Sequence, residues 1–296
     1  MDGILPLWKP KGLTSHDCVI KIRRLFNTKK VGHTGTLDPE VEGVLPICVG
    51  QATKIVPYLT DTKKTYIAEV RLGVATDTED QTGKIVEEKA VVQMPSNEEI
   101  DRALDAFRGE ISQIPPMYSA VKVKGKKLYE YARANQTVER PKRKVTIHLI
   151  KQLQREVNVN SFWIKVVCSK GTYIRTLCVD IGKKLGYPAH MKALTRTATG
   201  SISQEECVTF DQMTSIEIKE RKNFLLPVDK GLDHLDKIVV NQEMKNKIVH
   251  GQKLPQPENV PKTDPFVFMH EGELLAIYQI DPKRDQQIKA VRVFNR

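Results

Sequence analysis

The stretch 31–45 constrains the fold and the chemistry of this chain more than any other part of its sequence. Three glycines lie within it, at Gly32, Gly35 and Gly43. Pro39 follows Asp38 directly and biases it away from helical angles, while glycine permits backbone angles closed to other residues. The pattern predicts a shaped loop that presents the Asp38 carboxylate. Such a carboxylate can serve as nucleophile, base or electrostatic partner, or it can simply begin a turn and cap the next segment.

The charge of the chain suits a polyanionic partner. Lysine and arginine number 47 against 36 acidic residues, a net charge of +11 over 296 residues. Much of the excess lies in residues 122–151, which hold ten lysines and arginines against two glutamates. Tyr129 and Tyr131 interleave with this charge and favour contact with RNA, although a solvated face explains any single lysine there.

The cysteines and the N-terminus indicate a protein of the reducing cytoplasm. The five cysteines are odd in number and form no Cys-x-x-Cys pair, so they are interpreted as buried free thiols. An acidic residue stands where a signal peptide needs positive charge, and no stretch approaches eighteen apolar residues. We therefore expect a cytoplasmic protein with no membrane association.

Apolar periodicity predicts a mixed sequence of strands and helices. Strands are expected at 4–8, 65–74, 85–88, 119–125, 143–150, 160–168 and 191–202. Helices are expected at 15–25 with Ser15 as the cap, 50–59, 96–109, 127–134 and 173–185. A separate set of elements is expected after residues 233–237. It comprises one helix, 243–249, and the short strands 238–240, 266–269, 274–280 and 288–294.

Six blocks of the sequence resemble, in the same order, the motifs of the TruB family of tRNA pseudouridine synthases. The catalytic motif is matched by residues 32–39 together with Gly43-Val-Leu-Pro46. The other blocks are Lys9–Ser15, Lys64–Tyr66, Ile114–Ala120, Gly125–Ala132 and Ser169–Thr176. The resemblance implies an α+β catalytic domain over 1–234 with a mixed, largely antiparallel central sheet and a basic, thumb-like insertion at about 118–147. Residues 235–296 would form a small β-rich module similar to the PUA RNA-binding domain.

The resemblance also assigns roles to particular residues. Asp38 matches the catalytic aspartate, and Arg175 matches the arginine that pairs with it. Tyr66 matches the tyrosine that stacks on the target base and takes part in removing its proton. Leu194 and Tyr173 match residues that line the base pocket, and His33 matches the histidine that holds the target nucleotide out of its stack. RNA contacts are expected from Lys9, Asp80, Lys126 and Lys127.

The implied activity is isomerisation of uridine 55 in the T-loop of tRNA, with base flipping and without a metal or redox cofactor. The T-stem-loop would be the partner, with no guide RNA and no obligatory protein partner. The sequence leaves open whether Asp38 attacks C6 of the base or C1′ of the sugar, and an additional tRNA-folding activity is compatible with it. One rival is a noncatalytic RNA-binding or tRNA-folding factor. A metal-dependent RNA nuclease is a second rival, disfavoured because no carboxylate cluster is evident.

Overall fold

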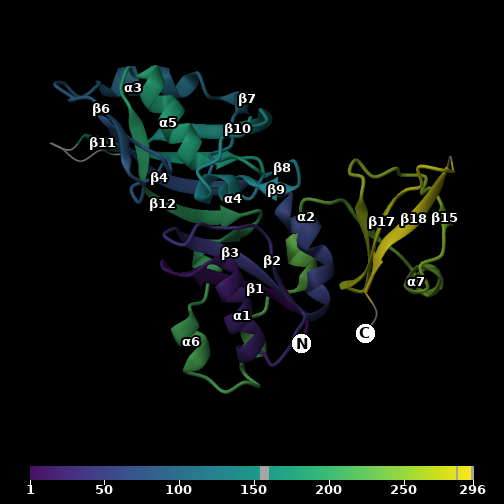
Figure 1. Ribbon diagram of the computed structural model, residues 1–296. Coiled ribbons are helices and arrows are strands. Elements are labelled where there is room, and N and C mark those ends of the chain that lie inside the picture. Colours follow the sequence, from purple (N-terminus) through teal and green to yellow (C-terminus); the bar gives the residue numbers. More distant parts are fainter. Residues whose placement is uncertain (154–159, 285, 295–296) are drawn as a thin grey trace.

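The computed structural model describes residues 1–153, 160–284 and 286–294. Its main element is a nine-stranded sheet with a mixed α and β surround (Figure 1). The strands are β1 (Gly3–Lys9), β2 (Val31–His33), β3 (Glu42–Val49), β4 (Lys64–Leu72), β7 (Gly109–Gln113), β10 (Arg143–Gln152), β11 (Ser161–Cys168), β12 (Ala189–Thr199) and β13 (Ile202–Ser203). They confirm the α+β fold and the strands expected around 4–8, 65–74, 143–150, 160–168 and 191–202.

The order of the strands places distant parts of the chain side by side. The path runs β1-β3-β12-β4-β11-β10-β7, with β2 beside β3 and β13 beside β12. All pairs are antiparallel except β12 with β3, which run parallel at Thr195 opposite Glu42 and Arg196 opposite Gly43. The sheet is therefore mixed and largely antiparallel, as expected. Strand β12 lies between β3, which follows the Asp38 loop, and β4, which carries Tyr66.

Both faces of the sheet are buried near β1 and β3. Leu5 and Leu45 belong to the larger apolar cluster, whereas their neighbours Ile4 and Val44 belong to a second cluster. This alternation follows from the strand period of two, which points successive side chains to opposite faces. Strands with two buried faces can lie deep in the molecule, so the loop that joins β2 to β3 is attached to a rigid base.

Helices cover the sheet on the side of the larger cluster. They are α1 (Ser15–Leu25), α3 (Asn97–Asp105) and α5 (Ile174–Lys184). Helix α5 packs on β12 and β4, and α3 packs on β10. The expected capping box at the start of α3 is present, because Ser96 and Glu99 satisfy each other's backbone N–H groups.

The expected cap of α1 is wrong. Thr14 is the N-cap, and its hydroxyl accepts a hydrogen bond from Asp17 N. Ser15 turns inward instead, where its hydroxyl accepts from Leu37 N at 2.9 Å and donates to Leu37 O at 3.3 Å. Thr14 can cap because it lies one residue outside the helix, which leaves Ser15 free to hold the loop that contains Asp38.

Short elements extend from the sheet. They are η1 (Gly50–Ile55), α2 (Val56–Thr60), β5 (Val74–Thr76), β6 (Ile85–Glu88), η2 (Gln204–Glu206), α6 (Phe210–Thr214), η3 (Arg221–Phe224) and η4 (Val228–Leu232). The expected helix at 50–59 divides into η1 and α2, and the α-helical turn begins with Pro57 in its first turn. The hairpin expected before 85–88 pairs β6 with β5, because β4 ends at Leu72 before Gly73.

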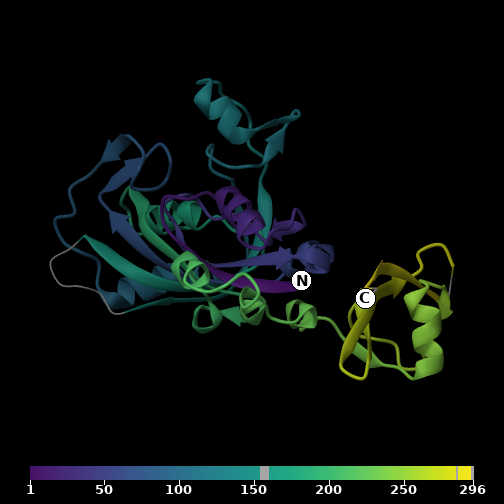
Figure 2. The same ribbon diagram turned by 90° about the horizontal axis from the view of Figure 1, so that it is seen from below.

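Most of the basic segment, residues 118–147, stands away from the sheet, while residues 143–147 pair with β7 within it (Figure 2). It contains β8 (Lys122–Val123), β9 (Lys126–Lys127) and α4 (Leu128–Arg133), and it returns to the sheet along β10. The strand expected over 119–125 is thus a two-residue arm of a small hairpin. An element of this kind has little core of its own, so it depends on local contacts.

The C-terminal part forms a second sheet, in yellow at the right of Figure 1. Its elements are β14 (Lys237–Val239), α7 (Gln242–Val249), β15 (Leu254–Pro255), β16 (Phe266–His270), β17 (Glu273–Ile280) and β18 (Gln287–Val293). One apolar cluster lies within it, around Phe266 and Tyr278. Val267 and Ile277, however, belong to the same cluster as Ile4 and Val44 of the central sheet. The two parts therefore share buried apolar surface.

None of the helices in the described parts of the chain has the length and apolar character needed to cross a bilayer.

Candidate active site

The loop between β2 and β3 carries Asp38 and is held by hydrogen bonds to three residues outside it. Ser15 holds Leu37 through both backbone groups. The Lys9 ammonium donates to Pro39 O at 3.1 Å, and Gly12 N donates to the same oxygen at 2.9 Å. These bonds fix the residues on either side of Asp38, so its carboxylate has a defined position.

The expectation that Lys9 contacts RNA is not supported by its position. Its side chain is fully buried and donates to Pro10 O and Pro39 O. Burial lowers the pKa of Lys9, and the nearby Asp38 and Glu40 carboxylates oppose that shift. Lys9 is thus a support of the Asp38 loop, which it joins to β1.

Arg175 meets Asp38 at the bottom of the site. Its Nε lies 3.1 Å from Asp38 Oδ2. The other two guanidinium nitrogens donate to backbone carbonyls, Nη1 to Thr78 O at 3.0 Å and Nη2 to Tyr118 O at 2.8 Å. Only 7% of the Arg175 side chain is exposed, against 42% for Asp38. The arginine is therefore held rigidly from three segments, while the carboxylate stays open to a ligand.

Asp80, expected to position RNA, lies beside Arg175 instead. Its Oδ2 is 3.9 Å from Arg175 Nη1, and its Oδ1 accepts bonds from the Thr78 and Thr82 hydroxyls. The side chain is 17% exposed. The Arg175 guanidinium thus lies between two carboxylates, those of Asp80 and Asp38.

The environment changes the acidity of Asp38 in opposing ways. Burial raises the pKa of the Asp38 carboxyl group above its ordinary range, the Arg175 guanidinium works against that shift, and Asp80 adds to it. A carboxylate near a pocket wall, with one buried cation at contact, is oriented without being neutralised. It can attack an electrophilic carbon or stabilise positive charge.

Asp38 opens into a cavity of about 420 Å³. Tyr66 and Leu194 line it from the adjacent strands β4 and β12, and Tyr173 lines it from the start of α5. Three apolar or aromatic side chains around one carboxylate can enclose a planar ring. The structure therefore brings together Asp38, Arg175, Tyr66, Leu194 and Tyr173, all expected from the sequence.

Tyr173 has an anchor that the sequence did not indicate. Gln113, 2% exposed, accepts from Tyr173 N at 3.0 Å and donates to Tyr173 O at 3.2 Å. Tyr173 is the N-cap of α5 and its side chain makes no cap bond, and the Gln113 amide satisfies the backbone N–H of Tyr173 itself. The position of Arg175, two residues further along, follows from this anchor.

His33 does not line the cavity. It ends β2 and is half-buried, and its Nδ1 accepts a long bond of 3.4 Å from Gly35 N. Burial lowers the pKa of His33, so the neutral ring is favoured. The histidine lies one residue before Thr34, which does line the cavity, so it stands next to the site without forming its wall.

Two buried cations in the wall were missed from the sequence, Lys64 and Arg196. Lys64 is 6% exposed and donates to Thr60 O and Thr62 O, and burial lowers its pKa to about 8. Arg196 is 2% exposed. Its spacing of two from Leu194 in an expected strand was the available signal, because residues two apart share a face.

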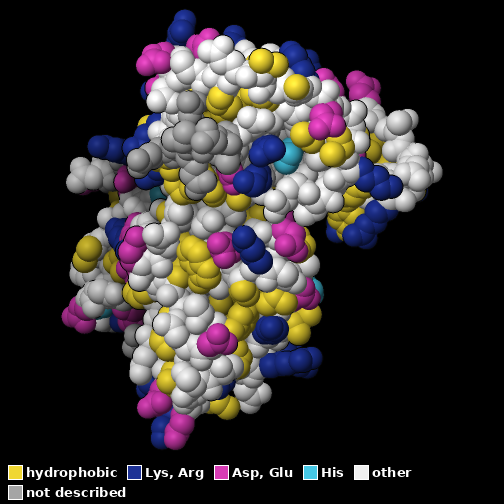
Figure 3. Space-filling view, turned by 90° about the vertical axis from the view of Figure 1, so that its left-hand side faces the viewer, with side chains coloured by type: hydrophobic (Ala, Val, Ile, Leu, Met, Phe, Trp, Pro, Cys, Tyr) yellow, Lys and Arg dark blue, Asp and Glu magenta, His cyan; other side chains and the backbone are white. Residues whose placement is uncertain are grey.

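Lys126 and Lys127 lie on the basic segment, as expected from the sequence. Lys126 stacks over the Tyr131 ring and Lys127 over the Tyr129 ring, at 6.0 and 5.3 Å from the centroids. Tyr129 also lines the cavity, so the basic segment reaches the site. By contrast, acidic and basic side chains are interspersed on the side of the molecule shown in Figure 3.

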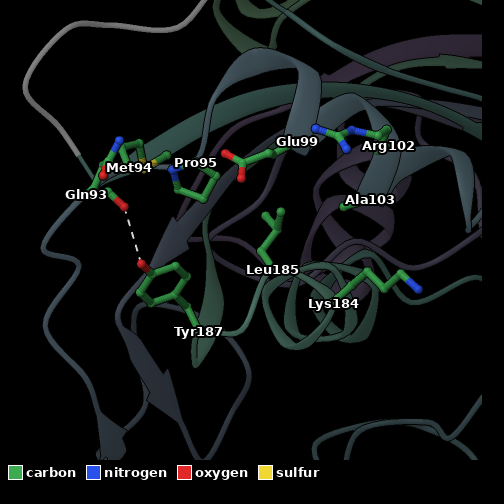
Figure 4. A pocket seen from close by; sticks show the side chains of 9 residues that line it. All are labelled: Gln93, Met94, Pro95, Glu99, Arg102, Ala103, Lys184, Leu185 and Tyr187. Atoms are coloured by element: carbon green, nitrogen blue, oxygen red, sulfur yellow. Dashed lines mark hydrogen bonds between the residues drawn. The ribbon is translucent and has the colours of Figure 1, made fainter.

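Another cavity, of about 490 Å³, lies between α3 and the end of α5 (Figure 4). Three of its polar side chains already have protein partners. The Tyr187 hydroxyl donates to Gln93 O, Glu99 accepts from Ser96 N, and Arg102 donates to Glu98 O. No set of polar groups converges on a ligand there, and we assign it no role.

Comparison with known proteins identifies the family. The family model "TruB family pseudouridylate synthase (N terminal domain)" matches residues 23–174, and "tRNA pseudouridylate synthase B C-terminal domain" matches 175–233. A tRNA pseudouridine synthase B from Oceanobacillus iheyensis is 62% identical over 296 residues, which cover 99% of this chain and 98% of that protein. The protein of the same name from Bacillus subtilis is 50% identical over 301 residues, covering 99% and 97%.

Solved structures show the same architecture. A chain in the crystal structure of a Cbf5-Nop10-Gar1 complex matches with a TM-score of 0.75 and 28% identity, over 99% of this chain and 84% of that one. A chain in an H/ACA RNP bound to a substrate RNA gives 0.72 and 26%, over 99% and 85%. The fold is that of a pseudouridine synthase. Within that class, the chain belongs to the TruB family.

Proposed function

We propose that this chain isomerises uridine 55 in the T-loop of tRNA to pseudouridine, with Asp38 as the nucleophile. The observation that carries the proposal is the Asp38–Arg175 contact of 3.1 Å at the edge of a cavity lined by Tyr66 and Leu194. The names of the relatives, which are tRNA pseudouridine synthases B, support tRNA as the substrate. The reaction joins C5 of the base to C1′ of the ribose in place of N1, and it consumes no redox cofactor.

The geometry supports a division of labour within the cavity. The target base must leave its stack, at a cost of a few kcal/mol, and contacts with Tyr66 and Leu194 would offset that cost. Asp38 would then attack either C6 or C1′, while Arg175 keeps the carboxylate ionised and in place. At the end, the proton on C5 is released. His33 would act next to this cavity on the flipped nucleotide.

The basic segment and the C-terminal sheet would bind the remainder of the T-stem-loop. We propose that the C-terminal part, residues 235–296, is a PUA-like RNA-binding module, supported by its compact five-stranded sheet. Because Val267 and Ile277 share an apolar cluster with Ile4, it would act as a fixed platform. We further propose that the enzyme works in the cytoplasm without guide RNA or a protein partner.

The test uses the full chain and a tRNA transcript labelled with tritium at C5 of uridine, with a chelator present. We expect release of about one label per tRNA, and no release from a transcript with cytidine at position 55. A tRNA that binds but releases no label would overturn the proposal and favour a tRNA-folding factor. Release from the cytidine-55 transcript would show that the target position is wrong.

A further inference from the structure

Arg196 is a buried cation in the wall of the active-site cavity. It is 2% exposed and lines the same cavity as Asp38 and Tyr66. No carboxylate in residues 1–153, 160–284 or 286–294 forms an ion pair with it. Burying a guanidinium without a carboxylate partner costs free energy. We therefore expect Arg196 to interact with another anionic or strongly polar group in the site.

The backbone fixes Arg196 between the two halves of the site. On β12 it lies opposite Tyr66 of β4 and opposite Gly43 of β3. Gly43 has φ +128°, and a Cβ there would come within 2.2 Å of Arg196 O, so only glycine fits. This close approach brings β12 against the end of the Asp38 loop.

The side chain of Arg196 also joins β12 to β3 and to the loop that contains Asp38. Its Nε donates to Val44 O at 2.7 Å, and its Nη2 donates to Gly35 O at 3.4 Å. Arg196 lies directly opposite Tyr66 on the neighbouring strand, and both residues line the cavity. Burial raises the pKa of the Tyr66 phenol, and the Arg196 guanidinium works against that rise. Arg196 thus contacts the loop that bears Asp38 and lies beside the tyrosine of the neighbouring strand.

We propose that Arg196 is a positioning residue that holds Tyr66 beside the Asp38 loop, so that the phenol oxygen of Tyr66 can accept the proton from C5. The inference rests on the proposed isomerisation and assigns Arg196 to its last step. In that step the phenolate oxygen takes the C5 proton. After attack at C1′, the electron pair of the C5–H bond forms the C5=C6 double bond, the π pair of the C6=N1 bond moves to N1, and N1 takes a proton from water. After attack at C6, the C5–H pair forms the same double bond as the bond from C6 to the Asp38 oxygen breaks, and N1 has taken its proton when it left the sugar.

The experiment compares Arg196→Gln, Arg196→Lys, Tyr66→Phe and the double variant Tyr66→Phe/Arg196→Gln. Arg221→Lys is the matched control, because Arg221 is also buried and donates to Met213 O and Leu25 O, away from the cavity. Single-turnover product formation is followed at saturating tRNA as a function of pH, with protium or deuterium at C5 of the target uridine.

In Arg196→Gln we expect the rise of rate with pH to move to higher pH by about one unit, with a primary isotope effect larger than that of the wild type. Arg196→Lys, which keeps the charge, should recover part of the shift. In the Tyr66→Phe background, Arg196→Gln should cause no further shift, and Arg221→Lys should cause neither change.

Slower turnover in Arg196→Gln without a pH shift or isotope effect would overturn the inference and leave Arg196 a purely structural residue. Absence of turnover in the wild type would instead overturn the proposed isomerisation. If the Arg196 variants do not fold, the ionisation of Tyr66 is measured in the wild type by ultraviolet difference against Tyr66→Phe. A phenol that ionises only above the pH range in which the rate rises would also contradict the inference.

Discussion

The active-site cavity and the basic segment differ in how their side chains are held. In the cavity, Arg175 bonds to Thr78, Tyr118 and Asp38, and these residues come from three separate segments of the chain. Between Lys122 and Arg133 of the basic segment the side-chain bonds are local. The Tyr131 hydroxyl donates to Val123 O, eight residues away, and Lys127 N bonds to the Glu130 carboxylate.

The difference indicates which property each region must preserve. Attack on a carbon atom requires the carboxylate to be fixed within a fraction of an ångström, and long-range bonds to buried groups achieve this. Contact with phosphates tolerates movement, because a lysine acts as a mobile point charge. The two regions meet at Tyr118, whose carbonyl accepts from Arg175 at the root of the basic segment.

The largest effect is expected for Asp38→Asn, which keeps the shape of the side chain but removes the nucleophile. The single-turnover rate should fall on the order of 10⁴-fold, while the dissociation constant for tRNA changes little. Quenched-flow label release and filter binding measure the two quantities. A parallel loss of binding would mean that Asp38 holds RNA and does no chemistry.

Arg175→Lys should lower the single-turnover rate on the order of 10²-fold. Lysine keeps the charge but cannot serve Asp38, Thr78 O and Tyr118 O together, so two buried carbonyls lose donors. The free energy of unfolding should also drop, by about 2–3 kcal/mol. Arg221→Lys, measured alongside by denaturant titration, should lose stability while its rate stays normal. A normal rate in Arg175→Lys would show that the carboxylate needs no fixed partner.

The double change Lys126→Ala/Lys127→Ala should weaken tRNA binding about tenfold at physiological salt and leave the single-turnover rate at saturation unchanged. The slope of log affinity against log salt should become shallower by about one unit for each phosphate that a lysine no longer neutralises. Lys219→Ala is the control, since Lys219 is exposed and forms an ion pair with Glu217. An unchanged slope would return Lys126 and Lys127 to an ordinary solvated face.

The smallest effect concerns pH. Because the pKa of Asp38 is raised by burial, the carboxylate becomes protonated at a higher pH than an ordinary aspartate. The rate should therefore be lost as pH falls, with a midpoint above the ordinary aspartate range. Asp80→Asn removes a charge that raises this pKa, so the acid limb should move to lower pH. Movement to higher pH would mean that Asp80 acts mainly by holding Arg175 in place.

The sequence predicted those features that depend on residues close together in the chain. The glycine and proline pattern around Asp38, the capping box at Ser96 and the period of β11 each depend on residues close in the chain. Together with the motif resemblance, they led to Asp38, Arg175, Tyr66, Leu194 and Tyr173, which the structure brings to one cavity.

The sequence could not reveal partners that are distant along the chain. Arg196 donates to Val44 O, 152 residues away, and the pairing of β12 with its other neighbour, β4, has two register irregularities. Lys9 was expected to contact RNA because it begins one of the blocks that resemble the family. Its side chain is instead buried against Pro39 O, 30 residues further along the chain. Likewise, Ile277 near the C-terminal end of the chain shares an apolar cluster with Ile4, so buried apolar contacts cross the expected boundary near 234.

The most direct test of the division between cavity and basic segment is a single-turnover measurement of C5 label release at saturating tRNA. It is made side by side on the wild type, Asp38→Asn and Lys126→Ala/Lys127→Ala. We expect the lysine variant to reach the wild-type rate once enough tRNA is present, whereas Asp38→Asn stays inactive at every concentration. Rescue of Asp38→Asn by excess tRNA, or a lasting defect in the lysine variant, would contradict this division.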